Sequence, residues 1–144
     1  MSKLTLQQAN AILQHALKKA REMKYKPLAV AVLDDAGNLK AAQREDGASM
    51  FRIDVATGKA WAAVGMDASS RALAKRAKDN PAFFHTLAAT AQGKFLPQQG
   101  AVLIKDADGR ILGAAGASGA TGDEDELACA YGIEQAGLTA DASA

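Results

Sequence analysis

The stretch GAVLIKDADGRILGAAGASGATGDED, residues 100–125, carries the strongest structural pattern in this chain. An apolar strand, an Asp-Ala-Asp-Gly turn and a second strand of small residues lead into a Gly/Ser loop and an acidic helix start. Residues 28–48, LAVAVLDDAGNLKAAQREDGA, repeat this plan. The patterns predict two β-hairpins, each ending in a polar, Gly-bearing loop before a helix. We expect the functional site at those two loops.

Length and composition favour one soluble domain over residues 1–144. A chain of 144 residues buries roughly 68–70% of its unfolded surface, so it needs no disulfide or structural metal. A single cysteine excludes an intramolecular disulfide, and no stretch approaches the ~18 apolar residues of a membrane span. The formal net charge of +1 lacks the basic excess of a dedicated nucleic-acid binder. We therefore expect a cytoplasmic protein with neither nucleic acid nor membrane as partner.

Helical periodicity fills most of the chain outside the hairpins. Thr5 and Gln8 form a capping-box pattern before a helix over residues 6–23. A second helix is expected to begin with Ser49 as its N-cap and to close at Gly65. Further helices are predicted over residues 67–78, 81–91 and 123–136, with residues 137–144 as a frayed tail. The fold class is therefore α/β of the α+β type, with helices flanking a mainly antiparallel sheet of about five strands.

The first loop offers a candidate anion site. Arg44 can grip a carboxylate with two parallel hydrogen bonds, and Asp46, beside Gly47, can orient a ligand hydroxyl or the arginine itself. An internal clasp between Arg44 and Asp46 within the loop is an equally good interpretation. Lys59 lies among small apolar residues on the next helix and either faces a pocket or, more commonly, is solvated along the helix.

The second loop resembles a phosphate cradle or a nucleophile elbow only in part. Acidic residues that include Asp125 and Glu126 fill the first turns of the following helix and would repel a phosphate. Ser118-Gly119 is followed by alanine, so the Gly-x-Ser-x-Gly pattern of a serine hydrolase is absent. The loop is interpreted either as a simple helix start whose glycines permit positive φ or as part of a small-molecule pocket.

Two histidines and one cysteine are the remaining ligand candidates. His15 lies on the polar side of the first helix and could ligate a metal or haem covered by another subunit, although a surface histidine is commoner. His85 follows two phenylalanines that could flank a porphyrin, although core packing is the commoner outcome. We expect Cys129, on the last helix, to be a buried and inert thiol and not a haem ligand. No spacing signature of a covalent haem site or of a separate metal site is present.

Taken together, the ordered motifs are similar to those of one known family. They comprise Val30-Ala31-Val32-Leu33-Asp34, Arg44-Glu45-Asp46-Gly47-Ala48, Lys59-Ala60, and Gly113-Ala114-Ala115-Gly116-Ala117-Ser118-Gly119 followed by Asp125-Glu126. Over almost its whole length the chain resembles the GlcG/HbpS haem-binding-like proteins, which include the C-terminal domain of PduO-type proteins. The resemblance implies a profilin-like or PAS-like α-β-α arrangement, non-covalent haem binding in several members, and assembly into dimers or larger oligomers, often octamers.

These observations support three hypotheses. The first is a homo-oligomer that binds haem or a related tetrapyrrole without a covalent link, with His15 and His85 as candidate ligands. The alternative is a small-molecule enzyme, of isomerase or lyase type, in which Arg44 anchors an organic or hydroxy acid and Asp46, Asp125 or Glu126 moves a proton. In that pocket Arg44, Asp46, Gly47, Lys59, Ser118, Gly119, Asp125 and Glu126 would bind the ligand. The third is an oligomer without a ligand, and the sequence does not decide whether the chain is an enzyme.

Overall fold

The computed structural model of the protein describes residues 3–144. Its elements follow one another as a helix, a hairpin, three helices, a second hairpin, a helix and a final short strand. They are α1 (Leu6–Glu22), β1 (Ala29–Asp34), β2 (Leu39–Arg44), α2 (Arg52–Met66), α3 (Ser70–Asp79), α4 (Pro81–Thr90), β3 (Ala101–Lys105), β4 (Ile111–Ser118), α5 (Gly122–Gln135) and β5 (Thr139–Asp141).

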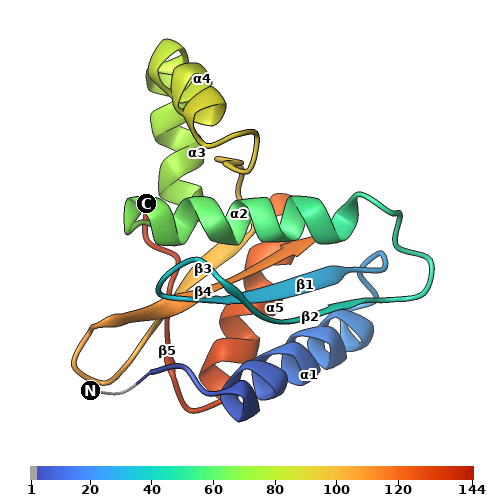
Figure 1. Cartoon of the computed structure of the whole chain (residues 1–144). Coiled ribbons are helices and arrows are strands. Elements are labelled where there is room, and N and C mark those ends of the chain that lie inside the picture. Colours follow the sequence, from blue (N-terminus) through green and yellow to red (C-terminus); the bar gives the residue numbers. More distant parts are fainter. Residues whose placement is uncertain (1–2) are drawn as a thin grey trace.

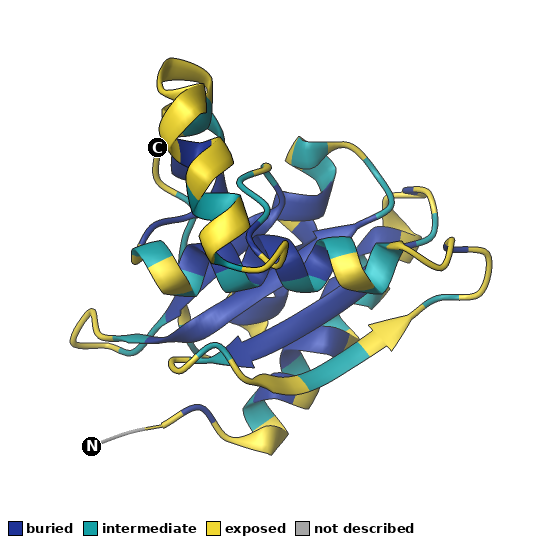
Figure 2. Ribbon diagram, turned by 45° about the horizontal axis from the view of Figure 1, so that its top comes forward, coloured by how far each residue is buried: buried dark blue, intermediate teal, exposed yellow. Residues whose placement is uncertain are grey.

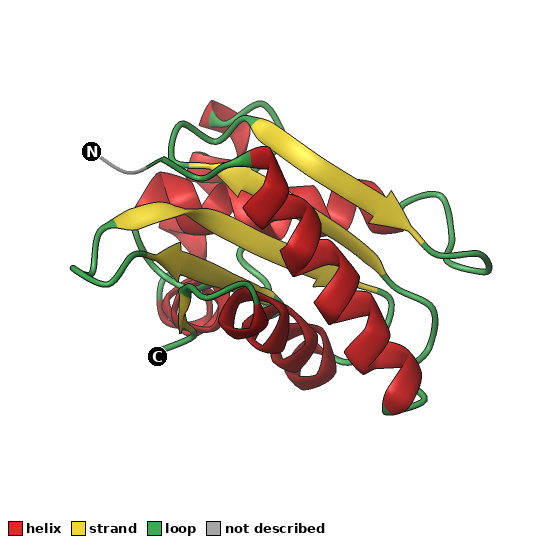
Figure 3. Cartoon of the chain, turned by 90° about the horizontal axis from the view of Figure 1, so that it is seen from below, coloured by secondary structure: helices red, strands yellow, loops and turns green. Residues whose placement is uncertain are grey.

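The strands form one open sheet in the order β2-β1-β4-β3-β5, and every neighbouring pair is antiparallel. Helices α1 and α5 cover one face, and α2 crosses the other (Figure 1). Figure 3 shows α1 and α5 side by side across the strands. Helices α3 and α4 project beyond α2, away from the sheet (Figure 1). This three-layer arrangement confirms the predicted antiparallel α+β fold.

Alternation along the strands divides the core between the two faces. Val30 and Val32 of β1 pack in the cluster beneath α1 and α5, whereas Leu33 packs with Ala60 and Ala63 of α2. The central strands are buried along most of their length, but β2 forms a largely exposed edge (Figure 2). Helix α2 therefore rests on the central strands and leaves the β2 edge uncovered.

Small residues allow the layers to approach closely. A Cβ atom at Gly116 of β4 would lie 2.2 Å from the carbonyl oxygen of Ala56 in α2, and one at Gly132 of α5 would lie 2.5 Å from that of Ile12 in α1. Real Cβ contacts do not reach these distances. The alanine and glycine content of the chain thus sets the spacing of both helix layers.

The starts of α1 and α3 agree with the sequence patterns, whereas the bounds of α2 and the C-terminal segment differ from them. The Thr5–Gln8 capping box is present, and Ser69 caps α3. Ser49 as the N-cap of α2 was wrong, because Phe51 holds that position and the carbonyl of Ser49 accepts the Arg52 N–H in a preceding turn. Gly65 does not close this helix, which continues to Met66 and ends at a left-handed Asp67.

The frayed tail was also a wrong prediction. Residues 139–141 form β5, which pairs with β3 at the edge of the sheet. Lys105 Nζ lies 2.6 Å from Asp141 Oδ2, and Ser69 donates its hydroxyl to the carbonyl of Ser143. These contacts order the segment after Gly137, whose positive φ of 83° follows the end of α5 as expected. No helix within residues 3–144 has the length and apolar character needed to cross a bilayer.

Candidate functional site

The open ends of the two hairpins lie at the same end of the sheet. Ala29, which begins β1, pairs with Arg44 at the end of β2 and with Ser118 at the end of β4. Neighbouring strands are about 4.8 Å apart, so the two flanking positions are separated by roughly 10 Å across β1. The sheet therefore brings the two loops together as predicted. The side-chain contacts described next show which charged groups lie close together there.

The cation that meets Asp125 is Lys59. Lys59 and Asp125 are both buried, with exposed fractions of 6% and 1%. Lys59 Nζ lies 3.2 Å from Asp125 Oδ2 and donates to the carbonyl oxygen of Ala117 at 3.0 Å. The other carboxylate oxygen accepts the Ala120 N–H at 3.1 Å. The expectation of a solvated Lys59 was wrong, because the close approach of α2 to β4 places this side chain between the layers.

Burial dominates the electrostatics of this core. Desolvation raises the pKa of Asp125, although Lys59 and the Ala120 N–H act to lower it. Burial also raises the pKa of the Cys129 thiol far above its usual range, and Sγ points at the Gly100 carbonyl oxygen, 3.8 Å away. A thiol held in its protonated form is a poor nucleophile and a poor haem ligand. This confirms the inert interpretation of Cys129.

Glu126 is engaged by a different cation. Arg71 of α3 holds it with two hydrogen bonds, Nε to Oε1 at 3.0 Å and Nη2 to Oε2 at 2.7 Å. Gln99 Nε2 adds a contact to Oε2 at 3.3 Å, and Asp123 joins the same cluster through Arg71 and Gln99. The paired geometry fastens α3 to the start of α5. Glu126 therefore serves as an anchor between α3 and α5.

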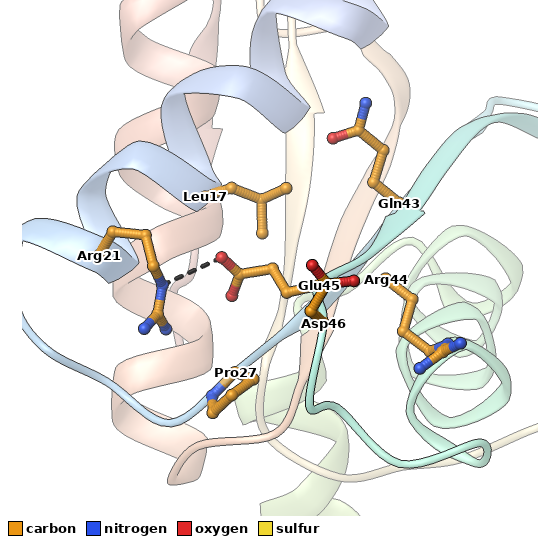
Figure 4. Close-up of a pocket in the computed structure, with 7 residues that line it drawn as sticks. All are labelled: Leu17, Arg21, Pro27, Gln43, Arg44, Glu45 and Asp46. Atoms are coloured by element: carbon orange, nitrogen blue, oxygen red, sulfur yellow. Dashed lines mark ion pairs between the residues drawn. The ribbon is translucent and has the colours of Figure 1, made fainter.

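Arg44 is not directed at the carboxylates of α5. Its Nη1 donates to the carbonyl oxygen of Ala48 at 2.6 Å, so Arg44 is tied to the loop backbone, and none of the ion pairs within residues 3–144 joins it to Asp46 as the predicted clasp would. Asp46 and Gly47 are exposed beside it. Figure 4 shows Arg44 pointing away from the ion pair between Arg21 and Glu45, whose Nε–Oε2 distance is 3.0 Å. A cavity of about 560 Å³ lies here between α1 and β2, lined by Leu17, Arg21, Pro27, Gln43, Arg44, Glu45 and Asp46.

Gly119 lines a second cavity, and Ser118 precedes it at the end of β4. Ser118 is buried, and its Oγ accepts a hydrogen bond from Arg52 Nη1 at 3.2 Å. Gly119 has a φ of +138°, and a Cβ there would lie 2.1 Å from the Pro27 carbonyl oxygen. Only glycine fits this crossing of the two loops. The cavity that Gly119 lines has a volume of about 450 Å³.

The two histidines lie in different parts of the molecule. His15 is half-buried on α1, which covers one face of the sheet, whereas His85 is exposed on α4, beyond the opposite face (Figure 1). Phe84 is buried against Phe95, with ring centroids 5.9 Å apart, but core packing does not extend to His85. Within residues 3–144 no three His, Cys, Asp or Glu side chains gather as a metal site. One protomer therefore cannot bring both imidazoles to the same ligand.

Comparison with known proteins assigns the chain to a family. Residues 4–134 match the family model described as haem degrading protein HbpS-like. The chain belongs to the HbpS-like family. No curated protein matches its sequence.

Solved structures similar to this HbpS-like chain share its fold. PduOC, crystallised as a haem complex, is 22% identical with a TM-score of 0.86, covering 97% of this chain and 99% of PduOC. HbpS is 29% identical with a TM-score of 0.80, covering 93% of this chain and 90% of HbpS. A double mutant of Streptomyces reticuli HbpS is 30% identical, also with a TM-score of 0.80, covering 93% and 87%.

The sequence patterns missed four residues that this HbpS-like fold places at the second cavity. Lys24, Tyr25 and Lys26 follow α1, and Arg52 begins α2. The sequence patterns place Lys24, Tyr25 and Lys26 just after the helix over residues 6–23, and Arg52 inside the helix expected after Ser49. The feature that could have revealed these residues is their positive charge. Two lysines and an arginine lie around a loop that the sequence already indicated as a possible ligand site.

Proposed function

We propose that this HbpS-like chain binds haem without a covalent link, on the outer face of α1 and α5, as a homo-oligomer in which a second copy completes the site. Family membership over residues 4–134 carries the proposal. The crystallised haem complex of PduOC, which has the same fold, supports it. Haem, when bound, supplies the redox-active iron.

The side chains of the outer face fit such a ligand. His15 is half-buried and one helical turn before Lys19, so both lie on the same side of α1. Lys19 Nζ lies 4.7 Å from the ring centroid of Tyr131 on α5. Leu127, 42% exposed, adds apolar surface on α5. Imidazole, apolar and aromatic surface, and a lysine are the groups that an iron porphyrin with carboxylate side chains requires.

The face is too open to enclose a ligand by itself. The hollow beside Tyr131 has a volume of about 280 Å³ and is lined by α5 residues alone. Pockets that enclose drug-sized ligands have volumes of roughly 300–1,000 Å³. A second copy seated against α1 and α5 would supply the missing wall and would also bury Leu127.

We do not extend the proposal to acid–base catalysis. Asp46 is exposed in its loop, whereas Asp125 is paired with Lys59 and Glu126 with Arg71. Asp125 and Glu126 are held by different cations, and Asp46 lines the cavity beside β2, which neither of them lines.

Titration of haemin into the purified protein tests the proposal. We expect a saturable shift of the Soret band, at least tenfold weaker binding in His15→Ala, and unchanged binding in His85→Ala, the matched histidine outside the site. Native mass spectrometry should find haem only in oligomers. Equal Soret shifts in the wild type and His15→Ala would exclude His15 as the ligand, and a spectrum like that of haemin bound nonspecifically to albumin would refute haem binding.

A further inference from the structure

A second cavity, beyond the C-terminal end of α1, is surrounded by positive charge. Its volume is about 450 Å³, and it lies between the α1–β1 connection, the first residue of α2 and the start of α5. The residues that line it are Lys24, Tyr25, Lys26, Arg52, Gly119, Ala120, Thr121 and Glu124. None of the groups placed on the haem-binding face lines this cavity.

The cations of the cavity lack anionic partners. None of the ion pairs within residues 3–144 includes Lys24, Lys26 or Arg52, although Arg52 acts at longer range to lower the pKa of Asp125, which is itself paired with Lys59. The single lining carboxylate, Glu124, accepts the Thr121 N–H at 3.1 Å as part of the capping box of α5. Three positive charges against one negative charge leave a net charge of +2 around the cavity. Such an excess attracts an anion. The phosphate repulsion expected from the acidic start of α5 is reduced, because Asp125 is paired with Lys59 and Glu126 with Arg71.

Arg52 is the cation best placed to bind one. It is half-buried, and the only hydrogen bond of its side chain within the described residues is from Nη1 to Ser118 Oγ, at 3.2 Å. A guanidinium group carries five N–H donors in a planar fork, so four remain. The fork matches two oxygens of one carboxylate or phosphate group.

Tyr25 provides an independent sign of a missing ligand. The residue is 9% exposed, and its hydroxyl makes no hydrogen bond within residues 3–144. No described side-chain oxygen is both fully buried and unsatisfied, so this hydroxyl keeps access to the cavity that Tyr25 lines. The pKa of Tyr25 is raised by burial and by the Glu124 carboxylate. A nearly buried donor without a partner is suited to an acceptor oxygen from outside the chain.

The backbone adds one unusual conformation at the same place. Lys24 has a φ of +58°, in the left-handed region where the residue after a helix is usually glycine. The chain carries a lysine there instead. The lysine side chain adds a positive charge to the lining of the cavity, which a glycine could not do.

We propose that this cavity binds a small oxyanion, a phosphoryl or carboxylate group, through Arg52, Tyr25 and the two lysines. The ligand is a small metabolite carrying at least one such group, held by the fork of Arg52 with the Tyr25 hydroxyl as a further donor. The site is separate from the haem-binding face and does not depend on haem.

Titration of the full chain, observed by amide NMR, tests this proposal with two probes. Inorganic phosphate and succinate are added separately at constant ionic strength, with sodium chloride as the blank. We expect saturable shifts at residues 24–26, 52 and 119–121 with at least one probe. Tighter binding of phosphate identifies a phosphoryl site, and tighter binding of succinate identifies a carboxylate site. Shifts that never saturate, or that chloride reproduces, would overturn the proposal.

Variants separate a built site from general attraction to a basic surface. Arg52→Gln should weaken binding about tenfold or more, since it removes the charged guanidinium fork, and Tyr25→Phe about threefold or more, since it removes one hydroxyl donor. Lys24→Gly, which relaxes the backbone, should weaken binding without unfolding the chain. Lys75→Gln on α3 removes the same charge far from the cavity and should change affinity less than twofold. Equal losses in Lys75→Gln and Arg52→Gln would refute the site, and thermal melts check that every variant is folded.

Discussion

Removal of Lys59 should leave Asp125 as a buried charge without a counterion. In Lys59→Met the methionine keeps the length of the side chain but loses the contacts to Asp125 Oδ2, at 3.2 Å, and to the Ala117 carbonyl, at 3.0 Å. The carboxylate keeps one hydrogen bond, from the Ala120 N–H at 3.1 Å. Both partners of the pair are more than nine-tenths buried, so water cannot take the place of the ammonium group without local opening.

The expected loss of stability in Lys59→Met follows from these lost and remaining contacts. Breaking a buried ion pair by removing one partner costs about 3–5 kcal/mol. The remaining Ala120 hydrogen bond favours the lower end, about 3 kcal/mol. For a chain of 144 residues that loss lowers the melting temperature by roughly 10 °C.

The loss should depend on pH. Burial already raises the pKa of Asp125, and Lys59 lowers it, so the variant raises it further. A carboxyl group whose folded pKa exceeds its unfolded pKa binds more protons in the folded state, and stability then falls as pH rises between the two values. The deficit of Lys59→Met relative to the wild type is therefore largest near pH 7. It shrinks as pH falls through the raised pKa of Asp125 and the carboxyl group takes up a proton.

Urea denaturation of both proteins at pH 7 and pH 4.5 measures the effect. Lys75→Met, an exposed lysine on α3, is the matched control and should lie within about 0.5 kcal/mol of the wild type. The double variant Lys59→Met with Asp125→Leu should recover much of the stability, because it removes the stranded charge. A loss below about 1 kcal/mol at pH 7, or the same loss at both pH values, would show that the pair is not the buried anchor described above.

Two further outcomes test the edge strand and the layer spacing. The hydrogen bond from Lys105 lowers the pKa of Asp141 to about 2, below its unfolded value, so its carboxylate stabilises the fold at neutral pH and that contribution is lost as pH falls toward 2. Both groups are about one-quarter exposed, so Asp141→Asn should cost about 1 kcal/mol at pH 7 and almost nothing at pH 2, measured by urea denaturation; an equal cost at both would disprove the ionic origin. Gly116→Ala should prevent folding or cost more than about 3 kcal/mol, since its Cβ would lie 2.2 Å from the Ala56 carbonyl oxygen. Gly65→Ala, whose Cβ meets nothing within 4 Å in α2, should gain about 0.5–1 kcal/mol, and thermal melts that reverse this order would contradict the close packing of α2 on β4.

The two hairpins were predictable because their chemistry is local. Asp34 Oδ1 accepts the N–H groups of Ala36 and Asn38, and Asp106 Oδ1 makes the same two bonds to the N–H groups two and four residues on. Each turn also contains a glycine with positive φ, at residues 37 and 109. Side chains that bond their own backbone act over four residues, so a sequence pattern suffices to find them.

The site was harder to predict because its partners are far apart in sequence. Lys59 and Asp125 are 66 residues apart, as are Arg52 and Ser118, and no local feature of α2 distinguishes a buried lysine from a solvated one. The prediction that the two loops lie at the same end of the sheet was correct. The cations that contact Ser118 and Asp125, however, are Arg52 and Lys59 of α2. β5 escaped prediction for a similar reason, because its three residues carry no apolar alternation and depend on β3 and Lys105 for their order.

The two proposed sites share two helices, yet the packing argues that they act independently. Helix α1 carries His15 and ends beside Lys24, while α5 begins at the oxyanion cavity and carries Tyr131 on the proposed haem-binding face. Coupling between two ligands requires an element with two arrangements that the ligands favour differently. At Gly132 the helices meet so closely that a Cβ would lie 2.5 Å from the Ile12 carbonyl oxygen. A contact this tight fixes one register between α1 and α5, so an anion in the cavity has no second arrangement of the haem-binding face to favour.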